Sequence, residues 1–173
     1  MYGYINGKIT DIEASYVILE NNGIGYLIYV PNPYGFMMER EYTIYTYTKV
    51  AEDEYTLYGF KTKEEKELFL KLISVKGLGA KLALPILATG SINGIVDAIN
   101  RENILYLTKF PKIGEKLARQ IVLDLKGKIN IEVSKVEDDS TEDLMETLSA
   151  LGYKTSEIKK VICLLYTSPS PRD

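Results

Sequence analysis

The sequence predicts an α+β protein of several domains, and three observations carry this prediction. The first third is rich in short runs of tyrosine, isoleucine, valine and threonine that are separated by turn residues, as β-strands are. The middle third changes to the apolar spacing of amphipathic helices and contains an internal repeat. The last third begins with a polar, acidic stretch and ends with two shorter helical patterns. We therefore expect a β-barrel, a helical domain and a small C-terminal helical region, in that order.

The strand-rich first domain is expected over residues 1–62. Turn signals occur at Asn6-Gly7, Asn22-Gly23 and Pro31-Asn32-Pro33. Five short strands in such a length suit a small closed barrel of the OB type, because closure removes exposed sheet edges. The alternation over residues 42–48 is less regular than in a sheet with one buried face, so both faces are expected to be partly covered. The expected strands are Tyr2–Thr10, Tyr16–Glu20, Gly25–Val30, Tyr42–Val50 and Tyr55–Phe60.

A helical domain is expected over residues 63–130. Thr62 and Glu65 have the spacing of a capping box, in which the threonine hydroxyl accepts from a first-turn N–H and the glutamate reaches back. Leu68 and Leu72 then begin an apolar helical face. From there to Lys128 the pattern is one of short helices broken by glycines.

An internal repeat with an offset of 35 residues is the most informative feature of the sequence. Residues 72–87 align with residues 107–122, and six of the sixteen positions are identical. Each copy has the pattern of a helix, a tight turn that closes on glycine, and a second helix that opens with lysine. This pattern predicts a helix–hairpin–helix unit that occurs twice.

The expected chemistry of each unit is phosphate binding. A glycine turn exposes the free N–H groups at the start of the following helix, where the positive end of the helix dipole also lies. Lys81 and Lys116 add a positive charge at the same place in both copies. Such contacts read backbone and shape rather than base sequence. The alternative is that each glycine turn is only a helix end followed by a new helix, but two copies with lysine in register favour DNA binding.

Charge is distributed unevenly along the chain. The net charge is −4 over residues 1–62, +5 over residues 63–130 and −4 over residues 131–173. A basic middle between acidic ends is typical of a polyanion-binding segment, although helices also collect lysine on solvated faces.

Several function classes are excluded or disfavoured by composition. The chain has no histidine and one cysteine, Cys163, which argues against a zinc site, a histidine-based triad or a disulfide framework and suits a reducing cytoplasm. The sequence contains no phosphate-binding loop of the Walker type, and no long apolar run that could span a membrane. No cofactor, metal or catalytic residue is therefore expected.

The C-terminal third is expected to hold a flexible linker over residues 131–141 and a small helical domain over residues 142–165. Two helices with few large apolar residues make a poor domain, so this domain is expected to be incomplete. Residues 166–173 contain two prolines and no helical period, and we expect a non-native or disordered tail. The apolar stripes of the two helices are Leu144, Leu148 and Leu151, and then Ile158 and Ile162.

One acidic cluster, Glu52-Asp53-Glu54, lies between two expected strands. A solvated loop is the simplest interpretation. The functional alternatives are a Mg²⁺ site of a nuclease, for which three adjacent carboxylates are a weak signal, or a negatively charged prong.

Taken together and in this order, these motifs closely resemble the RuvA family of Holliday-junction-binding subunits. The resemblance covers residues 1–162 and includes the start at Met1–Lys8, the Gly23–Tyr26 turn, Leu57–Phe60 and the two glycine-lysine turns. It implies an OB-fold domain, a tandem helix–hairpin–helix domain, a linker and a C-terminal domain that docks the RuvB motor. It further implies a homotetramer or octamer that holds a four-way junction open and flat, with no membrane partner, and that works with the RuvC resolvase in recombination and repair.

The resemblance also assigns roles to residues. Glu52 and Asp53 match the family's acidic pin, which replaces the solvated-loop interpretation of that segment. The apolar stripes of the C-terminal helices, given above, match the motor-docking region. The DNA-binding positions are Lys76, Gly77, Gly79, Lys81, Lys112, Gly114, Lys116 and Arg119.

The sequence departs from the family pattern at three places. Lys112 stands where the second hairpin usually has its first glycine, which predicts a strained or differently shaped turn. Pro85 falls inside the second helix of the first hairpin, where a kink is expected. The family's last helix is missing or replaced after Ile162.

Two other functions are carried as alternatives. The barrel could bind single strands through exposed tyrosines, although Tyr45 and Tyr47 are equally suited to a core. The acidic cluster could cut junctions with Mg²⁺.

Overall fold

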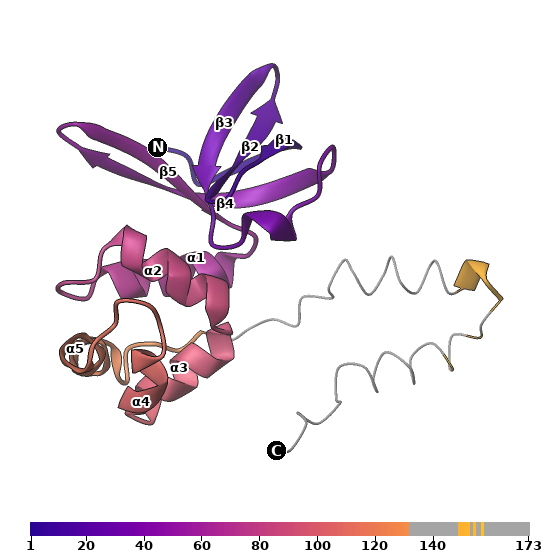
Figure 1. The fold of residues 1–173 in the computed structure, drawn as a ribbon. Helices are drawn as coiled ribbons and strands as arrows, with labels where there is room; N and C mark the ends of the chain where they lie inside the picture. Colours follow the sequence, from indigo (N-terminus) through magenta and orange to yellow (C-terminus); the bar gives the residue numbers. More distant parts are fainter. Residues whose placement is uncertain (132–148, 153, 155–156, 158–173) are drawn as a thin grey trace. The chain divides into compact units, whose positions relative to one another are not determined.

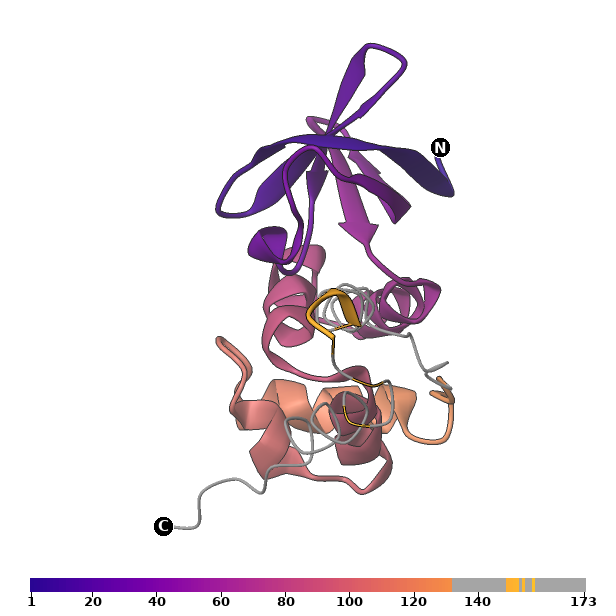
Figure 2. The same cartoon turned by 90° about the vertical axis from the view of Figure 1, so that its right-hand side faces the viewer.

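The computed structural model describes residues 1–131, 149–152, 154 and 157. The chain forms two compact units, Met1–Val133 and Ser134–Asp173. The first unit has the strands at one end and the helices at the other, as the two perpendicular views show (Figures 1 and 2). The α+β architecture expected from the sequence, a barrel followed by a helical domain, is confirmed.

The strands close into a barrel in the order β1-β2-β3-β5-β4. Neighbouring strands are antiparallel except β3 and β5, which meet in parallel at Tyr29 and Tyr58. All five strands expected from the sequence are present, and their ends lie within two residues of the expected positions. The elements of the barrel are β1 (Tyr4–Ile12), β2 (Tyr16–Asn21), β3 (Ile24–Tyr29), the short helix η1 (Pro33–Gly35), β4 (Glu41–Ala51) and β5 (Glu54–Phe60).

The Asn6-Gly7 turn signal is wrong, because both residues lie inside β1. Gly7 is needed there for a close approach: a Cβ at this position would lie 2.2 Å from the carbonyl oxygen of Glu20 on β2. A glycine inside a strand often marks such an approach rather than a turn. The other signals do fall between elements, at the β2–β3 hairpin and before η1.

Strand β4 is covered on both faces, as its irregular alternation predicts. Ile44, Thr46 and Thr48 point into the barrel and are buried. The intervening Tyr45 and Tyr47 are half-buried on the outer face. Tyr47 packs edge-on against Phe69 of the first helix, so the outer face of β4 is a contact surface rather than a solvated one.

Helices follow the barrel without a break in the chain. The expected capping box is present: the Thr62 hydroxyl accepts from the Glu65 amide at 3.2 Å, and the Glu65 carboxylate accepts from the Lys61 amide at 3.3 Å. The helices are α1 (Lys63–Ile73), α2 (Ala80–Thr89), α3 (Ile92–Asn100), α4 (Ile104–Thr108) and α5 (Glu115–Leu125).

One aromatic side chain joins the helices to the barrel. Phe69 of α1 is fully buried, and its ring centroid lies 4.7 Å from that of Phe60 and 5.5 Å from that of Tyr58, both on β5. Aromatic pairs at such distances contribute beyond the area they bury. The end of the barrel and the start of the helical domain therefore share one core.

Helix α2 runs through Pro85. Because proline has no N–H, the carbonyl of Lys81 lacks its usual intrahelical donor four residues later. The helix is nevertheless continuous from Ala80 to Thr89, and the Thr89 hydroxyl donates to the Pro85 carbonyl at 2.8 Å.

The chain after α5 stays with the helical core for several residues. Ile129 and Ile131 are both buried in the same cluster as the helices. Ile131 belongs to the segment that the sequence assigns to the linker. Of the residues assigned to motor docking, Leu151 is described and is exposed, whereas Leu144, Leu148, Ile158 and Ile162 lie outside the described residues.

No single helix in the described part of the chain is long and apolar enough to cross a membrane. Helices α2 and α3 pass that test only as a pair, and they are bent by 110° at the break between them.

We predict that Phe69→Ala lowers the free energy of unfolding by about 3–5 kcal/mol, because it empties the core shared by barrel and helices. Leu70→Ala, on the exposed side of the same helix, is the matched control and should cost under about 1 kcal/mol. Urea unfolding of both variants measures the difference. Equal losses in the two variants would show that the joint does not depend on Phe69.

Candidate nucleic-acid interface

The two repeated turns have the same backbone hydrogen bonds, 35 residues apart. In each turn, a backbone amide just beyond the first helix donates to a carbonyl of that helix. The amide three residues later donates to the carbonyl of the residue that carries the first amide. The bonds are Val75 N to Leu72 O (3.1 Å) and Leu78 N to Val75 O (3.1 Å), then Phe110 N to Leu107 O (3.3 Å) and Ile113 N to Phe110 O (3.2 Å). The repeat in the sequence is therefore a repeat in three dimensions.

The helices that follow the two turns start without a side-chain cap. Gly79 precedes α2 and Gly114 precedes α5, and neither helix has a side-chain acceptor for its first amides. By contrast α1, α3 and α4 are capped by Thr62, Ser91 and Asn103. An uncapped start leaves amide donors and the positive dipole end available to an external anion.

Neither Gly79 nor Gly114 is required by the protein itself. Their φ angles are −91° and −85°, which any residue adopts, and a Cβ built on either meets nothing within 4 Å. Both residues are exposed. Glycine at these positions leaves room for something outside the chain to approach the backbone closely.

The first residue of each turn does need an unusual backbone. Gly77 has a φ of +90°, and Lys112, at the equivalent position, has a φ of +62°. The second turn therefore keeps the shape of the first although it has lysine in place of glycine. The backbone strain expected at Lys112 is confirmed, whereas the alternative expectation of a differently shaped turn is not.

Positive side chains surround the two turns. The residues assigned to DNA binding are all exposed, and they lie in the two glycine turns or within the first five residues of α2 and α5. They are Lys76, Gly77, Gly79 and Lys81 at the first turn, and Lys112, Gly114, Lys116 and Arg119 at the second.

The second turn carries a carboxylate that the site assignment from sequence omits. Glu115 is the first residue of α5, where the first copy has Ala80. Arg119 donates to this carboxylate through Nη2 at 2.6 Å and Nε at 3.1 Å. Glu115 therefore pairs with Arg119 and places a negative charge at the start of α5, where the first copy has none. The alignment of residues 72–87 with residues 107–122 already contains this difference, as Ala80 against Glu115.

The acidic residues Glu52 and Asp53 form the tip of the hairpin between β4 and β5. Ala51 and Glu54 are the last cross-strand partners, so the turn consists of these two residues alone. Both are exposed, and no cation among the described residues forms an ion pair with them. The hairpin reaches out from the barrel on the same side as the turn between α1 and α2 (Figure 1).

Glu54 has a different role from the two residues at the tip. Its carboxylate accepts from Lys49 Nζ at 2.9 Å and from the Thr56 hydroxyl at 3.0 Å. These hydrogen bonds, and more weakly the charge of Lys81 on α2, hold the pKa of Glu54 below its usual range. The described residues contain no group of three or more carboxylate, histidine or cysteine side chains that could hold a metal ion.

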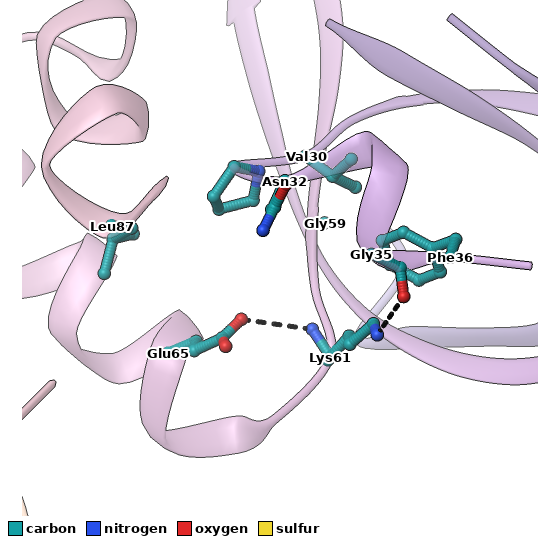
Figure 3. A pocket seen from close by; sticks show the side chains of 9 residues that line it. Val30, Asn32, Gly35, Phe36, Gly59, Lys61, Glu65 and Leu87 are labelled. Atoms are coloured by element: carbon teal, nitrogen blue, oxygen red, sulfur yellow. Dashed lines mark hydrogen bonds between the residues drawn. The ribbon is translucent and has the colours of Figure 1, made fainter. Parts of the chain in front are cut away.

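A small cleft lies where the barrel meets α1 and α2 (Figure 3). Its volume is about 140 Å³, well below the size of a typical ligand pocket. The charged side chains that line it are already paired: Lys61 Nζ donates to the Gly35 carbonyl, and Glu65, whose pKa burial raises, accepts from the Lys61 amide. The cleft is part of the joint between the two domains rather than a ligand site.

Comparisons with known proteins agree with this geometry. Residues 1–59 match the family model "RuvA N terminal domain", and residues 69–127 match "SAM-like Helix-hairpin-helix tandem". The subunit RuvA of the Holliday junction branch migration complex from Streptococcus agalactiae serotype V is 46% identical over 172 residues, which cover 93% of this chain and 88% of that protein. Its counterpart from Streptococcus pneumoniae strain D39 is 47% identical over 173 residues, with the same coverage of both chains. The chain belongs to the RuvA family.

The family resemblance predicted from the motifs is thereby confirmed. The RuvA N-terminal model covers the barrel with its acidic hairpin, and the helix-hairpin-helix tandem model covers both glycine turns. The residues assigned to DNA binding, to the pin and to motor docking remain predictions.

We predict that Lys112→Gly raises the free energy of unfolding by about 1 kcal/mol, because glycine adopts a positive φ without the penalty that a side chain brings. Lys109→Gly is the matched control: Lys109 ends α4 with a φ of −68°, so the same change there should destabilise. Thermal or urea unfolding distinguishes the two signs. A loss of stability in both variants would contradict the strain argument.

Proposed function

We propose that this chain binds four-way DNA junctions by their shape, holds them open, and serves as the DNA-binding subunit of a branch migration complex. It acts in recombination and repair and is not itself an enzyme. The observation that carries the proposal is the pair of uncapped helix starts with a lysine in register at each. The two RuvA relatives, named as subunits of a Holliday junction branch migration complex, support the same activity.

In this proposal the two turns grip the backbone of a DNA arm. Amides at Gly79 and Gly114 donate to phosphate oxygens, while Lys81 and Lys116 neutralise charge. Lys76, Gly77, Lys112 and Arg119 line the same surface, Arg119 after exchanging Glu115 for a phosphate. No base edge is read, so binding follows structure and not sequence.

The acidic tip acts by repulsion. Glu52 and Asp53 are exposed carboxylates in a protein whose ligand is a polyanion, so they cannot add to affinity. At the point where the arms meet, they oppose phosphates, keep strands apart and disfavour continuous duplex. Selectivity for a junction thus comes from the tip, and affinity comes from the two turns.

Assembly completes the site, because four arms need four copies of the gripping surface. We propose a homotetramer, or an octamer of two such rings, in the cytoplasm. A RuvB-type motor would dock on the C-terminal helices through Leu144, Leu148, Leu151, Ile158 and Ile162, and a RuvC-type resolvase would act on the opened junction. These partners follow from the family to which the chain belongs.

Binding of single strands by barrel tyrosines is the less supported candidate. Tyr47 is engaged with Tyr58 and Phe69 in the core between the domains. Tyr45 is half-buried beside Tyr4, with Lys63 over its ring. Gel shifts that compare a four-way junction, duplex and single strand, with and without Mg²⁺, test all three functions. Preference for the junction without cleavage supports the proposal, whereas preference for single strand or Mg²⁺-dependent nicking contradicts it.

We predict that Lys81→Ala and Lys116→Ala each weaken junction binding and flatten the log–log salt dependence by about 0.9 per lost phosphate contact. The loss should be larger for Lys81, because Glu115 already offsets part of the charge at the second turn. Lys8→Ala is the control, since it removes an exposed lysine of the barrel that is paired with Glu39. Fluorescence anisotropy at several salt concentrations measures the slopes. Unchanged slopes in both hairpin variants would place the DNA surface elsewhere.

We predict that Glu52→Gln combined with Asp53→Asn raises the affinity for plain duplex and reduces the preference for four-way junctions. Each removed repulsion is worth about 1 kcal/mol near a hydrated surface, and the effect should shrink as salt rises.

The matched control is Glu13→Gln combined with Asp11→Asn. These two exposed carboxylates lie at the end of β1 and directly after it. Competition binding with duplex and junction at low salt compares the two double variants. If the tip variant binds duplex no better than the control does, Glu52 and Asp53 are solvated turn residues only.

A further inference from the structure

The β4–β5 hairpin carries an exposed apolar pair directly behind its acidic tip. Val50 and Tyr55 are cross-strand partners, one step inward from Ala51 and Glu54. Each side chain is 68% exposed, and no ring or cation of the described residues stacks on Tyr55. A tyrosine ring held on a strand pair but left without a packing partner is an available contact surface.

The two faces of this hairpin differ in chemistry. Cross-strand partners share a face, so Lys49, Thr56 and Glu54 lie on one side, and Val50 and Tyr55 lie on the other. The polar side is internally hydrogen-bonded, and Tyr47 and Tyr58 on the same side pack against Phe69 of α1, the helix that leads into the first turn. The first helix–hairpin–helix turn is therefore on the polar side, and Tyr55 faces away from the surface proposed to grip a DNA arm.

We propose that Tyr55 is a stacking platform for an unpaired base at the centre of the junction, an inference that rests on the proposed function. The tip separates strands by repelling phosphates, and separated strands expose bases. Tyr55 lies two residues from Asp53, on the side of the hairpin that is turned away from the gripped arm. An exposed base meets this ring as soon as it passes the tip.

The chemistry of the site selects a base over other occupants. A phosphate is disfavoured because Glu52 and Asp53 lie next to Tyr55 in the hairpin and because no lysine or arginine of β4 or β5 lies on that face. A protein partner needs roughly 800 Å² of surface on each side, far more than one valine and one tyrosine offer. A flat aromatic face of any sequence stacks on a tyrosine ring, which suits a protein that reads no bases.

Stacking makes a different signature from the lysine contacts. A stacked base is worth roughly 5- to 140-fold in affinity on replacement of the aromatic residue by alanine. No counterion is released by stacking, so the salt dependence of binding should stay as in the wild type. Removing the acidic tip has the opposite effect on affinity, because loss of its repulsion strengthens the binding of duplex.

The test is a double-mutant cycle between protein and DNA. Wild type, Tyr55→Ala and Tyr55→Phe are titrated, as full chains, with a fixed-sequence four-way junction and with the same junction lacking the bases that flank the crossover. Tyr34→Ala is the matched control, because Tyr34 is 74% exposed but lies in η1, away from the hairpin. Sedimentation of each variant checks its assembly state.

We expect Tyr55→Ala to lose at least fivefold on the intact junction and to match the wild type on the abasic one, with Tyr55→Phe and Tyr34→Ala near wild type on both. An equal loss on the two junctions would overturn the proposal, because the ring would then act without the base. So would an unchanged affinity of Tyr55→Ala, or a change in assembly, which would make the ring a contact between copies. If the wild type itself shows no preference for the junction over duplex, the proposed function fails instead.

Discussion

The burial of Phe69 between the barrel and the helices is the contact on which the rest of the arrangement depends. Its ring meets Tyr47, Tyr58 and Phe60, which lie on the two strands that continue into the acidic hairpin. The same helix leads into the first glycine turn. One core therefore sets the position of the acidic tip relative to the first glycine turn. The proposed function requires this joint to be rigid, because charges of opposite sign then act on defined parts of one DNA molecule.

The two helix–hairpin–helix units are equal in backbone and unequal in charge. The first has Ala80 at the start of its helix and a free Lys81, whereas the second has Glu115 and a paired Arg119. The two units share buried apolar residues at equivalent positions, such as Leu78 and Ile113, and differ at exposed ones. If both turns bind DNA as proposed, the second turn would hold its phosphate less tightly than the first and would release it first. Such a difference would suit DNA that slides through the complex.

Much of this molecule could be predicted from its sequence because the signals are local. The strands follow from β-branched and aromatic runs, and the repeated turns follow from glycine and lysine at a constant offset. The errors and omissions come from contacts between distant residues. The sequence predicts a turn at Gly7, because only the fold brings the Glu20 carbonyl against this residue. Glu54 has a different role from Glu52 and Asp53, because the strand register brings Lys49 and Thr56 within reach of its carboxylate. Whether Lys112 would keep the glycine geometry depends on the packed helices on either side of the turn.

At Gly79 and Gly114, which the fold does not require, a change that stabilises the following helix would oppose the proposed binding of DNA. Serine at Gly79 would cap α2 and add a few tenths of a kcal/mol to its stability, with no clash in the fold. The same serine would consume the amide donors and stand in the path of a phosphate. A redesign that scores only the folded chain would therefore favour this change and erase the function. In the proposed function, glycine at these two positions therefore serves the encounter with DNA and not the fold.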